Sequence, residues 1–235
     1  MSEVLVSALS IALQKQVESA RAAYDRGKPE QAAELCAKIL DEQPACLSVR
    51  KLERAALLKL AAVRRTGLSK IVQAVSNAPF LLGGSMKLKD EPRTAFTSAE
   101  KLLRRDPQST AALGLLGQAA VALGWPETAV FAYEAASDLE HDRPDLLVAL
   151  SGAYLAAGRA KDAVHAADEA LRLQPANADA LALQRTASVA VTMAKGKWEQ
   201  AGDFRGKLAD EPKTTTLDQS AKLTSKPVPP KLGSG

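Results

Sequence analysis

A fixed period of 34 residues runs through the middle of this sequence. Gly124 opens the segment GWPETAVFAYEAASDLE, and Gly158, 34 residues later, opens GRAKDAVHAADEALRLQP. Eight further identities follow the same offset: Leu113 with Leu147, Leu116 with Leu150, Ala119 with Ala153, Ala122 with Ala156, Ala129 with Ala163, Ala132 with Ala166, Ala136 with Ala170, and Leu139 with Leu173. A fixed period of this length is the signature of a stack of similar structural units.

Each unit reads as two helices joined by a glycine turn. An apolar helical period precedes the glycine, and a second period follows it after about five residues. Glycine adopts the positive φ that closes a helix, and a proline such as Pro144 or Pro175 ends the second helix. Small residues at Gly117 and Ala129, and at Ser151 in the next unit, allow the paired helices to cross closely. One such pair cannot bury its apolar faces alone, so neighbouring pairs must stack.

These residues resemble the tetratricopeptide repeat family. Its pattern places a large residue, Leu-Gly, an aromatic, Gly, Ala, an aromatic, Ala and Pro over one 34-residue period. One copy offers Leu113, Leu116, Gly117, Gly124, Ala129, Tyr133 and Ala136, and the next offers Leu147, Leu150, Tyr154, Gly158, Ala163, Ala170 and Pro175. The resemblance implies an all-α fold, a right-handed α-solenoid of about four helix pairs with a C-terminal capping helix.

The pattern also reaches upstream, where one repeat is interrupted. The segment 26–44 contains Gly27, Ala32 and a closing Pro44, and Pro107 closes another second helix. These two prolines lie 63 residues apart, which exceeds one period by 29 residues. We therefore expect an insertion at about 66–92, between a first helix at 47–65 and a second helix at 93–106.

The end of the chain divides into a helix and a tail. An apolar period continues over about 177–200 without a partner helix, as expected of a cap that covers the last repeat. Residues 206–235 are rich in Pro, Lys, Ser and Thr and nearly free of large apolar side chains, which predicts disorder. The predicted organisation is a helical repeat domain over 1–205 and a basic tail over 206–235.

Composition and charge narrow the classes of function. Aromatic residues make up 4% of the chain, too few for a packed β protein or a base-stacking surface. The net charge is +4, and from Arg205 onward there are six basic and three acidic residues, so the body is nearly neutral. We therefore expect no nucleic-acid partner. No apolar stretch reaches about 18 residues, and the first 16 residues are predicted to form a helix rather than a signal peptide.

No pattern of catalytic or metal-binding residues is present. His141 and His165 lack Cys, Asp or Glu neighbours at ligand spacing, so both are predicted to be structural. Cys36 falls in a position for a buried core residue, and with Cys46 it fits a reducing, cytoplasmic compartment. Phosphate-binding, nucleophile-elbow and dinucleotide patterns are missing. We expect no enzyme, no cofactor, no metal and no small-molecule substrate.

The family resemblance implies a binding function. Tetratricopeptide solenoids bind peptides in a concave groove lined by the first helix of each repeat. Carried over by position, the groove residues would be Gly114, Gln118, Val121, Asp145, Val148, Gly152, Leu155 and Thr186. The family's carboxylate clamp needs Lys, Asn and Arg at such positions, and in this sequence they are missing, while Asp145 would repel a carboxylate. The resulting prediction is a protein-interaction scaffold or adaptor for a protein or peptide partner, with self-association left open.

The predicted insertion offers a second candidate surface. Phe80, Leu81 and Leu82 lie beside a Gly pair and are flanked by lysines. Exposed, they would form an apolar patch with basic edges, as at a partner or membrane interface; otherwise 79–88 folds back on the solenoid. The alternative functions are thus a peripheral membrane-associated assembly factor that uses 79–88, or a regulatory subunit of an enzyme complex.

Overall fold

A computed structural model describes residues 3–63 and 87–196 of this chain. The chain divides into two compact units, Met1–Val191 and Thr192–Gly235, and only the first five residues of the second are described. The described residues form one short 3-10 helix and nine α-helices: η1 (Val6–Ala8), α1 (Ile11–Asp25), α2 (Pro29–Glu42), α3 (Leu47–Val63), α5 (Pro92–Arg105), α6 (Thr110–Ala122), α7 (Pro126–Ser137), α8 (Pro144–Ala156), α9 (Ala160–Leu173) and α10 (Ala178–Gly196).

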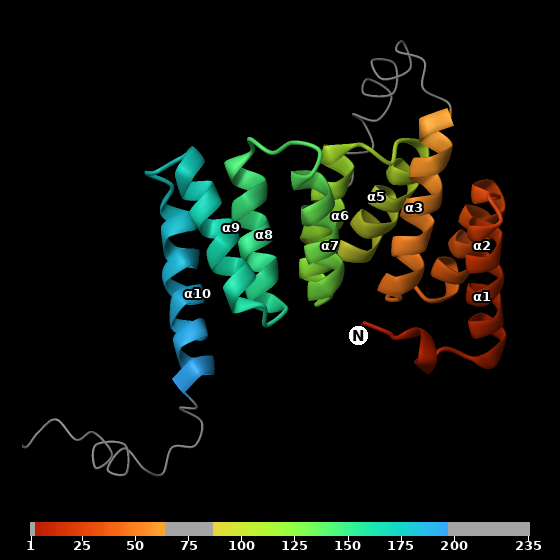
Figure 1. The fold of residues 1–235 in the computed structure, drawn as a ribbon, viewed down its shortest axis with the longest axis horizontal. Helices are drawn as coiled ribbons and strands as arrows, with labels where there is room; N and C mark the ends of the chain where they lie inside the picture. The colour runs from red at the N-terminus through yellow and green to blue at the C-terminus, as the bar shows by residue number, and fades with distance from the viewer. Residues whose placement is uncertain (1–2, 64–86, 197–235) are drawn as a thin grey trace, which may run out of the picture. The chain divides into compact units, whose positions relative to one another are not determined.

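Consecutive helices of the first unit lie side by side (Figure 1), with close backbone packing from α1 to α3 and from α5 to α9, and they form helix pairs in chain order. The pairs are α1 with α2, α3 with α5, α6 with α7, and α8 with α9, followed by α10. We call the α3–α5 pair the interrupted repeat, the α6–α7 pair the third repeat and the α8–α9 pair the fourth repeat. Residues 3–63 and 87–196 contain no strand. The predicted all-α helical-repeat solenoid is therefore confirmed.

The turns between paired helices form where the sequence predicts them. Gly27, Gly124 and Gly158 have φ of 74°, 70° and 75°, values that strain any residue with a Cβ. The prediction that Pro144 ends a second helix is wrong. Helix α7 ends at Ser137, and Pro144 is the first residue of α8, where its missing N–H costs no helical hydrogen bond.

Small residues bring the helices of the third repeat together. A Cβ added at Gly117 would lie 2.7–2.9 Å from three atoms of the Tyr133 ring, so α6 and α7 approach as closely as the glycine allows. Ala136 and Ala170 are fully buried at helix contacts, as the shared offset predicts. Ala170 packs with Leu147 of α8 and with Ala180, which seats the start of α10 on the last helix pair.

The helices next to the predicted insertion and the capping helix have the following bounds among the described residues. Helix α3 ends at Val63, and α5 begins at Pro92. Of the predicted insertion at 66–92, only 87–92 is described, and Leu88 there packs against the main apolar core. Helix α10 covers Ala178–Gly196, close to the predicted 177–200. The predicted domain boundary after residue 205 lies outside the described residues.

The N-terminal segment is not the continuous helix predicted for it. Helix α1 begins only at Ile11, behind a Ser10 cap whose side chain accepts a hydrogen bond from the Leu13 N–H. Residues 3–9, which we call the N-terminal strap, run along the lower ends of the helices in Figure 1. The Val4 N–H donates to the Ala45 carbonyl between α2 and α3, at 3.0 Å.

The strap ends on the third repeat. Glu3 accepts hydrogen bonds from the Thr128 N–H and hydroxyl, both at 2.6 Å, and from the Glu127 N–H at 3.1 Å. These groups lie in the first turn of α7, where backbone N–H groups have no partner within the helix and attract a negative charge. The strap therefore ties the first repeat to the third and passes the base of the interrupted repeat.

Candidate functional site

The groove residues predicted on α6 lie on the side of that helix which its neighbours leave uncovered. Gln118 and Val121 are exposed, and Gly114 is half-buried, at spacings that share one helical face. Val121 is 52% exposed, unusually high for a valine in a helix otherwise buried. The remaining faces of α6 carry seven buried residues that pack in the core. Residues 3–63 and 87–196 therefore leave this face of α6 exposed.

The predicted residues on α8 and α10 are accessible as well. Val148, Gly152 and Leu155 are half-buried, while Asp145 and Thr186 are exposed. The Thr186 hydroxyl donates to the Ala182 carbonyl of its own helix at 2.9 Å, so its donor is used internally.

Asp145 carries its own counter-charge. Arg143 donates to both of its carboxylate oxygens, at 2.8 and 2.6 Å, and to Glu140 at 2.9 Å. The hydrogen bond from Arg143 is the main cause that lowers the pKa of Asp145. The repulsion expected between Asp145 and a ligand carboxylate is therefore reduced.

Two of the predicted residues are glycines that face open space. A Cβ added at Gly114 or at Gly152 would meet nothing within 4 Å, in contrast to Gly117 on the buried side of α6. Packing against Tyr133 thus requires a glycine at position 117, whereas no described residue sets such a requirement at Gly114 or Gly152. They leave a low, uncovered backbone floor on α6 and α8.

The remaining predicted candidates form no second site among the described residues. Phe80, Leu81 and Leu82 lie outside the described residues. His141 and His165 are exposed, and residues 3–63 and 87–196 hold no group of three or more His, Cys, Asp or Glu that could bind a metal. Within those same ranges no helix has the length and apolar character to cross a membrane. Burial and, secondarily, Glu53 raise the pKa of Cys36 to about 12, so this thiol is unreactive, as predicted.

A further cluster, absent from the sequence predictions, lies on the buried face of the interrupted repeat. Helix α3 begins 63 residues before α6. At this offset charged residues of α3 occupy positions that are apolar or glycine in α6: Arg50 for Leu113, Glu53 for Leu116 and Arg54 for Gly117. Arg50 and Glu53 are only 4% and 6% exposed. Charged side chains are rarely buried this deeply unless they are paired.

The charges of α3 pair with charges of α5. Arg50 Nη2 lies 2.7 Å from Glu100 Oε1, and Arg104 Nε lies 2.8 Å from Glu53 Oε1. The Arg50 guanidinium also lies over the Phe96 ring, 4.7 Å from its centre. Arg54 Nη1 instead donates to the Pro107 carbonyl, at 2.5 Å. We call Arg50, Glu53, Arg54, Glu100 and Arg104 the charged cluster.

Burial disfavours the charged forms of the side chains in this cluster, whereas ion pairing favours them. Burial raises the pKa of Glu53 above its usual range, although Arg104 opposes the shift. Burial lowers the pKa of Arg54, and the charge of Asp138 only partly offsets it. Each ion is thus held at a desolvation cost, which a buried pair recovers only with good geometry and complete hydrogen bonding.

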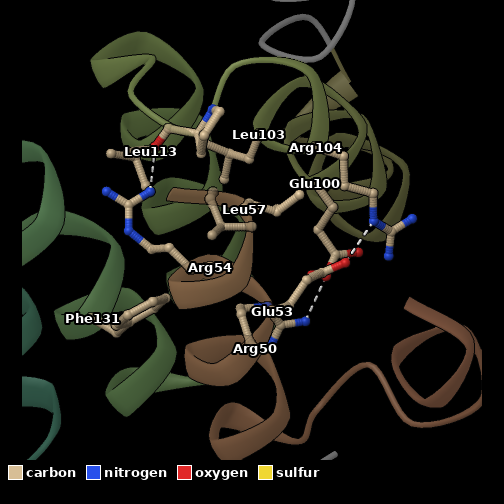
Figure 2. Close-up of a pocket in the computed structure, with 11 residues that line it drawn as sticks. Arg50, Glu53, Arg54, Leu57, Glu100, Leu103, Arg104, Leu113 and Phe131 are labelled. Atoms are coloured by element: carbon tan, nitrogen blue, oxygen red, sulfur yellow. Dashed lines mark hydrogen bonds and ion pairs between the residues drawn. The ribbon is translucent and has the colours of Figure 1, made fainter. Parts of the chain in front are cut away.

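The charged cluster borders a cavity of about 20 Å³. Apolar side chains from four helices complete its wall, among them Leu57, Leu103, Leu113 and Phe131. In Figure 2 the Arg54 side chain reaches past Phe131 toward Leu113, while Arg50, Glu53, Glu100 and Arg104 lie together on the opposite side of Leu57. The sequence does contain the signal for this site, because extending the repeat register to α3 puts three charges in core positions.

Comparisons with known proteins find similar solved structures only. No protein-family model and no curated protein matches the sequence. Solved structures do match. The first TPR of Spaghetti (RPAP3), solved bound to the HSP90 peptide SRMEEVD, is 19% identical, with a TM-score of 0.47 over 49% of this chain and 93% of that one. That neighbour is a tetratricopeptide-repeat domain.

Two further similar structures extend over more of the chain. MamA is 19% identical, with a TM-score of 0.44 over 86% of this chain and 96% of that one. A thermophilic TPR protein of Thermus thermophilus, TTC0263, is 21% identical, with a TM-score of 0.41 over 76% and 98%. At these identities the likeness concerns the fold alone.

Proposed function

We propose that this chain is a non-catalytic scaffold that holds a segment of another protein along the exposed face of the third and fourth repeats. The observation that carries the proposal is the open space at Gly114 and Gly152. A glycine inside a helix costs about 0.5–1 kcal/mol relative to alanine. Because no described residue contacts the position of the missing Cβ atoms, the close approach of a ligand gives this cost a physical reason.

The chemistry of this face favours an apolar segment. Val121, Val148 and Leu155 supply accessible apolar surface beside the glycine floor. Polar groups are few: Gln118, Asp145 and Thr186. We expect binding driven mainly by burial, at about 25 cal/mol per Å² of apolar area, with weak dependence on salt. A helix laid into this face or an extended peptide would both suit it.

The ligand of the RPAP3 domain is not carried over to this chain. The peptide SRMEEVD in that structure is acidic. The predicted groove residues include no Lys or Arg, and the nearby Arg143 already pairs with Asp145 and Glu140. The proposal rests on the glycine floor and its apolar neighbours.

A pair of double variants tests the proposal. Gly114→Leu with Gly152→Leu fills the floor, whereas Gly114→Ala with Gly152→Ala relieves the glycine cost and leaves most of the space. Both should fold with equal or higher thermal stability. Partners recovered from the native source and identified by mass spectrometry should persist with the alanine pair and fall with the leucine pair.

Undiminished partner recovery by a folded leucine pair would exclude this face as the binding surface. The next candidate surface would then be Phe80, Leu81 and Leu82. The same purification, analysed by light scattering, separates a foreign partner from a second copy of the chain. For the location we infer a reducing compartment such as the cytoplasm, because Cys36 and Cys46 are buried free thiols.

A further inference from the structure

The two helices of the interrupted repeat pack less closely than those of the other repeats. The backbones of α1 and α2, of α6 and α7, and of α8 and α9 are in close contact, as are those of α2 and α3 and of α5 and α6. Between the described residues of α3 and those of α5 or α6 there is no comparably close backbone packing. The described helices up to α9 therefore fall into two blocks, α1–α3 and α5–α9. We call the contact between the two blocks the joint.

The sequence gives a reason for this looser contact. Arg54 of α3 occupies the position equivalent to Gly117, and Ala99 of α5 occupies the position equivalent to Tyr133. In the third repeat the glycine lets the two backbones approach, whereas a long guanidinium side chain holds them apart. Contact across the joint is made instead by the side chains of the charged cluster, through ion pairs of 2.7 and 2.8 Å.

The closed joint is imperfectly packed. The Arg50 Nε and Nη1 atoms are buried and have no partner among the described residues, which costs free energy. The cavity of about 20 Å³ lies between side chains of both blocks. Opening the joint would return the buried charges to water and recover their desolvation cost. Separation of the blocks here therefore costs less than separation of two well-packed apolar faces, and such a place is where local opening is expected.

The N-terminal strap crosses this joint. On the first block, the Val4 N–H donates to the Ala45 carbonyl at 3.0 Å. On the second block, the Glu3 carboxylate accepts from the N–H and the hydroxyl of Thr128, both at 2.6 Å. Val4 also packs against an apolar cluster of the first block and against the main apolar core. The blocks can separate at this end only if the strap releases Thr128.

We propose that the joint between α3 and α5 is a hinge of the helical stack and that the N-terminal strap is its latch. With Glu3 seated on the first turn of α7, the two blocks are held closed. When Glu3 is released, the first block swings away and the face of α5 turned toward α3 becomes accessible. The glycine floor of α6 and α8 lies wholly within the second block, so the hinge stands or falls independently of the proposed scaffold function.

Thiol labelling of the full chain tests the hinge. Ala99→Cys places a thiol on α5 opposite α3, and Ala167→Cys places one at the equivalent position of α9; both alanines are fully buried. A buried thiol reacts only in opened molecules, so its labelling rate follows the open population. Peptide mapping by mass spectrometry separates each site from Cys36 and Cys46. With the strap intact, we expect the Ala99→Cys thiol to react faster than the Ala167→Cys thiol, and equal rates would overturn the hinge.

Release of the latch tests the strap. Glu3→Lys should raise the labelling rate of Ala99→Cys by about 5–30-fold, the equivalent of about 1–2 kcal/mol, and leave that of Ala167→Cys unchanged. Glu127→Lys makes the same charge change on the same turn of α7 but keeps the groups that hold Glu3, so it should change neither rate.

Two results would overturn the latch. One is an unchanged rate at Ala99→Cys in the Glu3→Lys variant, and the other is an equal rise at both thiols, which would indicate global unfolding. If Glu3→Lys fails to fold, Glu3→Gln replaces it. A smaller rise confined to Ala99→Cys would then support the latch, and no rise would overturn it.

Discussion

The interrupted repeat and the third repeat place helices in equivalent positions and fill the space between them differently. In the third repeat, Leu113 and Leu116 are fully buried, and Gly117 lets α6 approach the Tyr133 ring. In the interrupted repeat, Arg50 and Glu53 occupy the positions equivalent to Leu113 and Leu116. Arg54 occupies the position equivalent to Gly117. One repeat is thus held by close apolar contact and the other by paired charges around a cavity.

The difference shows that the repeat architecture does not need an apolar interior in every unit. Ala95 and Ala129 occupy equivalent positions of α5 and α7, and both are fully buried. The second helices therefore pack in the same register in the two repeats. The charged cluster replaces only the face of α3 that meets α5. Stability in a solenoid is a sum of such local terms, so the two repeats can be weakened separately.

The largest expected effect is loss of one partner in the charged cluster. Glu100→Ala leaves Arg50 buried without its carboxylate, which should lower the free energy of unfolding by about 3–5 kcal/mol. Glu134→Ala is the matched control, because Glu134 holds the equivalent position in α7, is 39% exposed and accepts from the Tyr154 hydroxyl at 2.7 Å. We expect about 1 kcal/mol there. Urea unfolding measures both, and equal losses would show that the two repeats do not differ as described.

The second prediction removes a whole ion pair. Arg50→Met with Glu100→Leu replaces the pair by apolar groups of similar size, as at Leu113 of the third repeat. Replacing a buried pair in this way is neutral or stabilising by about 1–4 kcal/mol. The double variant should therefore unfold at higher urea than Glu100→Ala. A double variant as unstable as the single one would mean that the interrupted repeat requires its charges in order to fold.

How much of the structure the sequence predicts differs between the interrupted repeat and the third repeat. The period predicted the third and fourth repeats, including the turns at Gly124 and Gly158, because apolar spacing and glycine turns are local signals. Whether Pro144 ends one helix or begins the next was not predictable from the residue type, because proline both follows helices and begins them.

Two features of the structure could not be predicted from local sequence patterns. Extending the repeat register to α3 reveals that charged residues occupy core positions there. An apolar repeat pattern, however, gives no indication of which charges pair across α3 and α5. The contact of Glu3 with Thr128 joins residues 125 positions apart in the chain. No spacing rule reaches that far, so only the folded structure reveals the strap.

The third prediction sharpens the comparison at the helix crossing. Gly117→Ala drives a Cβ to 2.7–2.9 Å from the Tyr133 ring, so the ring must move. Overpacking of this kind costs about 1–3 kcal/mol. Gly114→Ala, on the open face of the same helix, should instead gain about 0.5–1 kcal/mol. Thermal unfolding of the two variants should give shifts of opposite sign, and a stabilised Gly117→Ala would contradict the close approach of α6 and α7.

The smallest expected effect concerns the strap that passes the interrupted repeat. Glu3→Gln keeps the shape of the side chain and one acceptor oxygen, but it removes the negative charge at the first turn of α7. The interaction of that charge with the helix N-terminus contributes about 1 kcal/mol at low salt. We expect Tm to fall by about 2–4 °C. Glu127→Gln removes an exposed carboxylate from the same turn and should have a smaller effect, one that added salt abolishes. Thr128 beneath Glu3 is fully buried, so the Glu3→Gln loss should persist in salt. Equal and equally salt-sensitive losses in the two variants would mean that Glu3 is one surface charge among others and does not tie the first repeat to the third.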